Sequence, residues 1–173
     1  MLFNMINKFN YYFITLFIFS DTIKKYRGTW ASLFTVLFLF FVFYFLQISI
    51  FFVSIFFLLI LFYSYFAIKT CLKNFKESDP QEIVIDEFIG QSIPIILFEL
   101  FHDDRDYSLE EALQIYFWFF LLFRLFDGLK PFPIDYVDKK FKNTFGILFD
   151  DILAGLYVVL CLVIFMVGKT YIL

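Results

Sequence analysis

Long apolar stretches separated by short polar segments make up most of the chain. The stretch 33–66 contains no charged residue, and it is longer than the about 20 residues that one membrane-spanning helix needs. Gln47 and Ser49 interrupt this stretch near its middle. We therefore expect a helical hairpin, with one span at residues 31–47 and a second at residues 49–67.

The N-terminal part has a less regular pattern. Polar residues interrupt the apolar ones in residues 1–19, which predicts an amphipathic segment at the membrane interface rather than a span. The interrupting residues are Asn4, Asn7, Lys8 and Asn10. Residues 20–32 are polar and contain Gly28, so we expect a loop there. We take residues 1–25 as an interfacial segment at the start of a single domain that covers residues 1–173.

A third apolar helix is expected after the hairpin. The pair Asp79-Pro80 suits a helix start, because Asp is a good N-cap and Pro fits the first helical position. The helix would then continue through Asp86 and Glu87 to Phe101.

Two more helices are predicted towards the C-terminus. Ser108, with Glu111 three residues later, predicts a capping box at the start of an apolar helix. This helix would include residues 112–126. A last span is expected at residues 152–167, after a segment at residues 127–151 that we interpret as a loop with short helical pieces.

The composition places much of this chain in lipid. Hydrophobic residues make up 62% and aromatic residues 25% of the sequence, whereas soluble proteins are about 45–50% apolar. A soluble fold of this size could not bury 31 Phe. The sequence therefore predicts an all-α, polytopic integral membrane protein with about four to five membrane helices. It has no basic run with interleaved aromatic residues, so no nucleic-acid partner is expected.

The positive charges predict an orientation. With five crossings and the N-terminus in the cytoplasm, the outside segments hold only Arg105 and Lys169. All the other Lys and Arg residues fall inside, as the positive-inside rule requires. The same topology gathers acidic residues at the cytoplasmic face.

The first acidic group lies near the predicted helix start at residue 80. Asp79, Glu82 and Asp86 are three and four residues apart, so on a helix they would share one face. Mg²⁺ is a natural partner for such carboxylates, because it prefers oxygen ligands. The alternative is an ordinary solvated helix end, where the helix dipole also favours acids.

Two further groups of charged residues lie at predicted helix ends. Arg124 and Asp127 are three residues apart, and Lys130 follows in a proline-rich segment that suits phosphate binding. Asp150 and Asp151 enter the last apolar span, where unpaired charges are costly. A structural Arg–Asp pair and a solvated helix start are the respective alternatives.

These charged segments resemble the motifs of a known family. Residues 79–90, DPQEIVIDEFIG, resemble the DPxEIVxDExxG signature of the phosphatidylglycerophosphatase A family. Residues 123–133, FRLFDGLKPFP, resemble its FRxFDxxKPxP motif. Residues 146–155, GILFDDILAG, resemble its GxxxDDxxAG motif.

A fourth segment is similar to the same family but departs from its pattern. Residues 28–32, GTWAS, are similar to the family's PGTxGS segment, with Arg27 where Pro is usual and Ala31 where Gly is usual. In total the resemblance covers residues 26–165.

The resemblance implies an activity and a location. It implies a Mg²⁺-dependent hydrolase that converts phosphatidylglycerophosphate, a membrane phospholipid, to phosphatidylglycerol and inorganic phosphate. The expected location is the bacterial inner membrane, with the active site at the cytoplasmic face.

The charged residues then take expected roles in the site. The expected metal ligands are Asp79, Glu82, Asp86, Asp150 and Asp151. Arg124 and Lys130 would bind the phosphate, and Glu87 or Asp127 would orient or deprotonate the attacking water. Alternatives are a phosphatase for another lipid phosphate, such as phosphatidic acid, and a non-enzymatic membrane transporter or scaffold.

Overall fold

Every element in the described part of the chain is helical. The computed structural model describes residues 2–17, 25–75, 80–101 and 107–172. The elements are α1 (Leu2–Ile14), α2 (Arg27–Phe40), a π-helical segment η1 (Phe41–Phe45), α3 (Ile50–Cys71), a short 3₁₀ segment η2 (Leu72–Asn74), α4 (Ile85–Phe101), α5 (Leu109–Leu129), α6 (Ile134–Lys140) and α7 (Thr144–Ile172). The all-α prediction is therefore confirmed.

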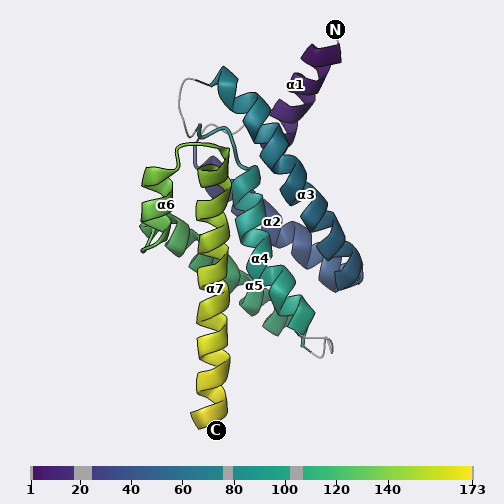
Figure 1. Cartoon of the computed structure of the whole chain (residues 1–173). Helices are drawn as coiled ribbons and strands as arrows, with labels where there is room; N and C mark the ends of the chain where they lie inside the picture. Colours follow the sequence, from purple (N-terminus) through teal and green to yellow (C-terminus); the bar gives the residue numbers. More distant parts are fainter. Residues whose placement is uncertain (1, 18–24, 76–79, 102–106, 173) are drawn as a thin grey trace.

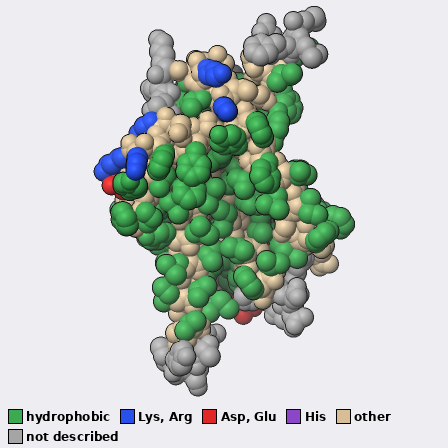
Figure 2. All heavy atoms as spheres, in the orientation of Figure 1, with side chains coloured by type: hydrophobic (Ala, Val, Ile, Leu, Met, Phe, Trp, Pro, Cys, Tyr) green, Lys and Arg blue, Asp and Glu red, His purple; other side chains and the backbone are tan. Residues whose placement is uncertain are grey.

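Among the described residues, four helical segments are long and apolar enough to cross a membrane. They are Arg27–Phe45, Ile50–Asn74, Leu109–Leu129 and Thr144–Gly168. Figure 2 shows hydrophobic side chains over most of the middle of one face, with Lys and Arg gathered toward one end. Soluble proteins rarely expose so large an apolar surface, so these features indicate a multi-pass membrane protein.

Helix α4 lies at the centre of the bundle and packs against α2, α3, α5 and α7 (Figure 1). Its closest neighbour is α7, and small residues allow that approach. A Cβ atom added to Gly155 would lie 2.3 Å from the carbonyl oxygen of Gly90. A Cβ atom added to Gly90 would lie 2.5 Å from the carbonyl oxygen of Asp151. The two backbones can cross this closely only because neither glycine carries a side chain.

The predicted hairpin is confirmed, but its first helix begins earlier than expected. Helix α2 starts at Arg27, so the loop predicted at residues 20–32 is wrong from that residue on. Gly28 lies within the first turn of this helix. Its lack of a side chain does not make a bend there but lets Glu87 approach the helix closely. An added Cβ atom would lie 2.1 Å from Oε1 of Glu87.

The predicted start of the third helix is wrong. Helix α4 begins at Ile85, and the segment before it is non-helical because a contact distant in sequence holds it. The backbone N–H of Val84 donates to the carbonyl of Ile14 at 3.0 Å, and Val84 is fully buried. Glu82 and Asp86 therefore do not share a helical face, and Asp79 lies outside the described residues.

The beginning of α5 confirms one prediction, and that of α7 corrects another. The capping box at Ser108 and Glu111 is present. The last helix begins at Thr144, well before the predicted residue 152. The side chain of Asn143 accepts hydrogen bonds from the N–H groups of Phe145 and Gly146 at 3.0 and 3.1 Å, so it caps the helix there.

The N-terminal helix α1 packs against α3. Asn10, one of the polar residues that interrupt its apolar pattern, is buried. Its amide donates to Oγ1 of Thr70 at 2.8 Å, and its carbonyl oxygen accepts from the hydroxyl of Tyr63 at 2.6 Å. This polar residue therefore attaches α1 to its neighbour.

Candidate functional site

A polar cavity of about 440 Å³ lies where the first turns of α2 and α4, the end of α5 and the early part of α7 meet. Charged residues of all three family-like motifs line it. They are Asp86, Glu87, Arg124, Asp127, Lys130, Asp150 and Asp151. Sequence segments that are far apart thus contribute to one site.

Three of these acids form a tight cluster. Asp86, Glu87 and Asp151 each place a carboxylate oxygen so that all three oxygens lie within 4.8 Å of one another. The first two residues belong to the first turn of α4, and the third lies on α7. The close packing at Gly90 and Gly155 brings the two helices, and therefore these carboxylates, together.

The cluster is poorly solvated, which makes its negative charge unfavourable. Asp86 and Asp151 expose only 8% and 4% of their surface. Burial, followed by the charges of Glu87 and Asp151, raises the pKa of Asp86 well above its ordinary value. Burial also raises the pKa of Glu87 to about 7, although a hydrogen bond with Asp86 opposes this rise.

A divalent cation fits this environment. Within the described residues, Oε2 of Glu87 is buried and has no hydrogen-bond partner. A buried polar atom without a partner is costly and calls for an explanation, such as an ion or a water molecule. A hard cation would coordinate this oxygen and offset the repulsion between the three carboxylates.

Arg124 brings a positive charge to the same cavity. Its Nη1 atom lies 2.8 Å from Oδ2 of Asp127 and donates to Oγ of Ser32 on α2 at 3.4 Å. A Cβ atom added to Gly28 would lie 3.4 Å from the same nitrogen. The guanidinium therefore lies between the end of α5 and the first turns of α2.

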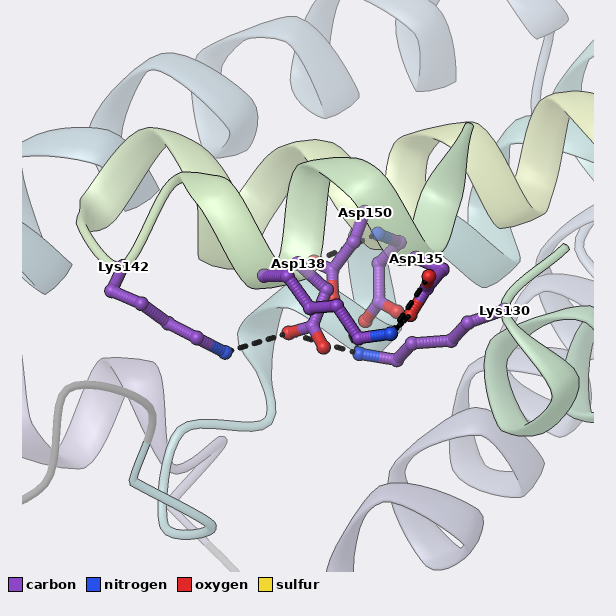
Figure 3. A network of polar contacts seen from close by, with 7 residues as sticks. Lys130, Asp135, Asp138, Lys142 and Asp150 are labelled. Atoms are coloured by element: carbon purple, nitrogen blue, oxygen red, sulfur yellow. Dashed lines mark hydrogen bonds and ion pairs between the residues drawn. The ribbon is translucent and has the colours of Figure 1, made fainter. Parts of the chain in front are cut away.

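Lys130 is held by two carboxylates (Figure 3). Its Nζ atom lies 2.8 Å from Asp150 and 3.3 Å from Asp138, and Asp138 also pairs with Lys142 at 3.2 Å. Burial alone would lower the pKa of Lys130, but the hydrogen bond and charges of these acids outweigh it and raise the pKa above its ordinary value. Burial alone would raise the pKa of Asp138, but its interactions with Lys130 and Lys142 outweigh that effect, so the pKa is lowered.

Among the described residues, two other predicted metal ligands do not belong to the cluster. Asp150 is adjacent to Asp151 and lines the cavity, but its carboxylate is paired with Lys130. Glu82 forms an ion pair with Arg27 at 3.3 Å, and 37% of its side chain is exposed. Asp79 is outside the described part of the chain.

Sequence reasoning missed two residues beside the site. Asp138 lies on α6 and holds Lys130; its only local signal is the spacing of four residues to Lys142. Gln91 is fully buried one turn after Glu87, and neither of its amide atoms has a hydrogen-bond partner in the described structure. A polar residue within an apolar helix was the signal available for Gln91.

Comparisons with known proteins support the resemblance. Curated relatives include phosphatidylglycerophosphatase A of Haemophilus influenzae, 43% identical over 82 residues, and that of Escherichia coli, 34% identical over 83 residues. A putative phosphatidylinositol-3-phosphatase of Bacteroides thetaiotaomicron is 37% identical over 79 residues.

These matches cover 47%, 48% and 46% of this chain, respectively, and 44%, 42% and 44% of the relatives. The matched region thus spans less than half the length of each curated relative. No solved structure matches the chain. The family model for phosphatidylglycerophosphatase A, however, matches residues 12–166. Because this match includes every segment that lines the cavity, the chain belongs to the phosphatidylglycerophosphatase A family.

Proposed function

We propose that this chain is a Mg²⁺-dependent lipid phosphatase that hydrolyses phosphatidylglycerophosphate to phosphatidylglycerol and inorganic phosphate. The observation that carries the proposal is the pairing, in one cavity, of a buried acidic cluster with Arg124 and Lys130. The names of two relatives supply the substrate. Cationic side chains and a metal ion both offset the charge of a phosphate dianion and position it for attack.

The acidic cluster is the proposed metal site. Asp86, Glu87 and Asp151 would hold Mg²⁺, and the unpartnered Oε2 of Glu87 is the oxygen that most needs such a ligand. The ion, when bound, would offset the negative charge of the phosphate and orient it for attack. Asp150 reaches the cavity from the same helix but is engaged by Lys130.

Arg124 and Lys130 are the proposed phosphate-binding residues. Each is paired with a carboxylate at 2.8 Å, Arg124 with Asp127 and Lys130 with Asp150. An incoming phosphate would take over part of these contacts, which leaves Asp127 able to accept a proton. Charge-assisted hydrogen bonds of this kind are the stronger ones in proteins.

Asp127 is the proposed general base, since Glu87 belongs to the metal cluster. It would take a proton from water as the water oxygen forms a bond to phosphorus. The bond between phosphorus and the glycerol oxygen breaks, and that oxygen takes a proton from solvent to become the free hydroxyl of phosphatidylglycerol. Asp127 then returns its proton to solvent. Exchange of Asp127 for Asn would then slow turnover more than it weakens substrate binding.

The proposed location is the bacterial inner membrane with the cavity facing the cytoplasm. The distribution of Lys and Arg supports this orientation, because all of them except Arg105 and Lys169 fall on that side in the five-crossing topology. Helix α4, with 17 residues, would be the third and shortest crossing.

Phosphate release from phosphatidylglycerophosphate in detergent micelles tests the proposal. The purified protein should release phosphate with Mg²⁺ and should stop when EDTA is added. Phosphatidic acid and phosphatidylinositol 3-phosphate belong in the same panel, the latter because of the name of the Bacteroides relative. Faster release from either of these lipids would replace the proposed substrate, and no release from any of them by folded protein would favour a transporter or scaffold.

A further inference from the structure

The first turn of α2 forms one wall of the cavity. Tyr26, Arg27, Gly28 and Thr29 all line it. The position of Gly28 shows how close this wall is to the reacting groups. Its added Cβ atom would lie 2.1 Å from Oε1 of Glu87 and 3.4 Å from Nη1 of Arg124. Residue 27 is therefore next to the point where the acidic cluster and the phosphate-binding arginine meet.

Arg27 places a largely desolvated guanidinium in this wall. Only 12% of its side chain is exposed, and its Nη1 atom lies 3.3 Å from Glu82, whose side chain is more exposed. Arginine suits phosphate recognition because its planar fork can donate two parallel hydrogen bonds.

The proposed substrate carries two phosphate groups, and Arg124 and Lys130 would bind only one of them. Arg124 and Lys130, at the end of α5, would bind the terminal monoester that is cleaved. The phosphodiester that joins the headgroup to diacylglycerol also needs a counter-charge if it enters the same cavity. Arg27 comes from a different helix, α2, and can serve this second group.

We propose that Arg27 binds the phosphodiester group of the substrate and so selects a lipid with two phosphates over one with a single monoester. This inference deepens the proposed function and rests on it. It predicts that the two products report on different parts of the cavity. Phosphatidylglycerol keeps the diester and should depend on Arg27, whereas inorganic phosphate should not.

The test measures inhibition by each product in Arg27→Gln and Arg27→Lys. In Arg27→Gln the inhibition constant of short-chain phosphatidylglycerol should rise about tenfold, which corresponds to the loss of one charge-assisted contact. The constant for inorganic phosphate should stay within about threefold of the wild type. Arg27→Lys, which keeps the charge, should recover part of the affinity. Lys139→Gln is the matched control. This substitution removes the same charge from a lysine on α6 whose side chain is 72% exposed.

A structural role for the Arg27–Glu82 pair gives a different result. Both inhibition constants would then shift together, along with a fall in thermal stability, and this outcome would overturn the proposal. If Arg27→Gln does not fold, Arg27→Lys decides, since an unchanged ratio of the two constants overturns it as well.

A calorimetric titration separates this inference from the proposed activity. Short-chain phosphatidylglycerol is titrated into detergent-solubilised wild type and variants without any turnover. Weaker binding to Arg27→Gln, but not to Lys139→Gln, supports a diester site even in a protein that releases no phosphate. Equal binding of phosphatidylglycerol to the wild type, Arg27→Gln and Lys139→Gln would overturn the proposed diester site.

Discussion

At the scale of single residues, the site is a set of buried charges that balance poorly without a cation. Asp86 and Asp151 are almost fully buried, and Glu87 keeps one carboxylate oxygen without a hydrogen bond in the described structure. Such groups destabilise a fold unless something of opposite charge offsets them. The same residues should therefore affect both metal binding and stability.

Asp86→Asn and Asp151→Asn should each abolish turnover while leaving the protein in the membrane. Each change removes one negative charge, so the variants should unfold in EDTA at the same temperature as the wild type or a higher one. They should also lose most of the rise in unfolding temperature that Mg²⁺ gives to the wild type. Phosphate release and thermal unfolding with and without Mg²⁺ measure these effects. Wild-type activity in both variants would remove these residues from the metal site.

Gln91→Met should separate function from stability. The amide of Gln91 is buried without a partner, and such a group costs about 1–3 kcal/mol. Met fills a similar volume without that cost, so the unfolding temperature should stay the same or rise. Because Gln91 follows Glu87 by one helical turn, the Mg²⁺ concentration for half-maximal activity should rise several-fold. Unchanged Mg²⁺ dependence would show that the amide has no part in the site.

At the scale of elements, the crossing of α4 and α7 sets the geometry of the acidic cluster. The helices approach closely enough for Gly155 to contact the backbone of Gly90. Neither backbone can move aside as a flexible side chain would. The distance between the carboxylates of α4 and α7 therefore depends on the absence of two side chains.

Gly155→Ala should impair folding and activity together. The added methyl group would lie 2.3 Å from a backbone oxygen, so the helices must separate, at a cost of about 1–3 kcal/mol. The unfolding temperature, phosphate release and Mg²⁺-dependent stabilisation should all fall. Gly168→Ala, the same change on the same helix, meets no atom within 4 Å and should behave as the wild type. Equal behaviour of the two variants would contradict the role of close packing.

At the scale of the whole molecule, the bundle places the charged cavity at one end. Helices α4 and α7 begin at the end where α6 lies, and α5 begins at the opposite end (Figure 1). If the apolar helices between these ends span a membrane, the cavity lies at one membrane surface. Which surface this is follows, in our proposal, from the lysines and arginines.

Labelling of single cysteines tests this orientation. Ser108→Cys and Lys139→Cys, both at exposed positions, are made in a background that lacks Cys71 and Cys161. A maleimide that does not cross membranes should label residue 108 in intact spheroplasts and residue 139 only after permeabilisation. The reverse pattern would place the cavity on the outer face.

The sequence by itself determined the helical class, the membrane hairpin and the family. The length of an apolar stretch and a helix cap such as Ser108 with Glu111 depend only on residues that are close in the sequence. Both can therefore be predicted without knowledge of the tertiary structure. The motifs also named most of the charged residues that line the cavity in the described structure, with Lys25 and Arg27 as the exceptions. Asn143 was a local signal too, and reading it as a cap would have placed the start of α7 correctly.

Only the tertiary structure decided where α4 begins and which acids meet. Val84 is held by a hydrogen bond to Ile14, a contact between residues far apart in the chain, and this bond keeps Glu82 off the helix. The acidic cluster likewise joins two residues of α4 to Asp151 on α7. Local patterns cannot reveal such contacts, because they form only when the helices pack and the glycines let the backbones approach.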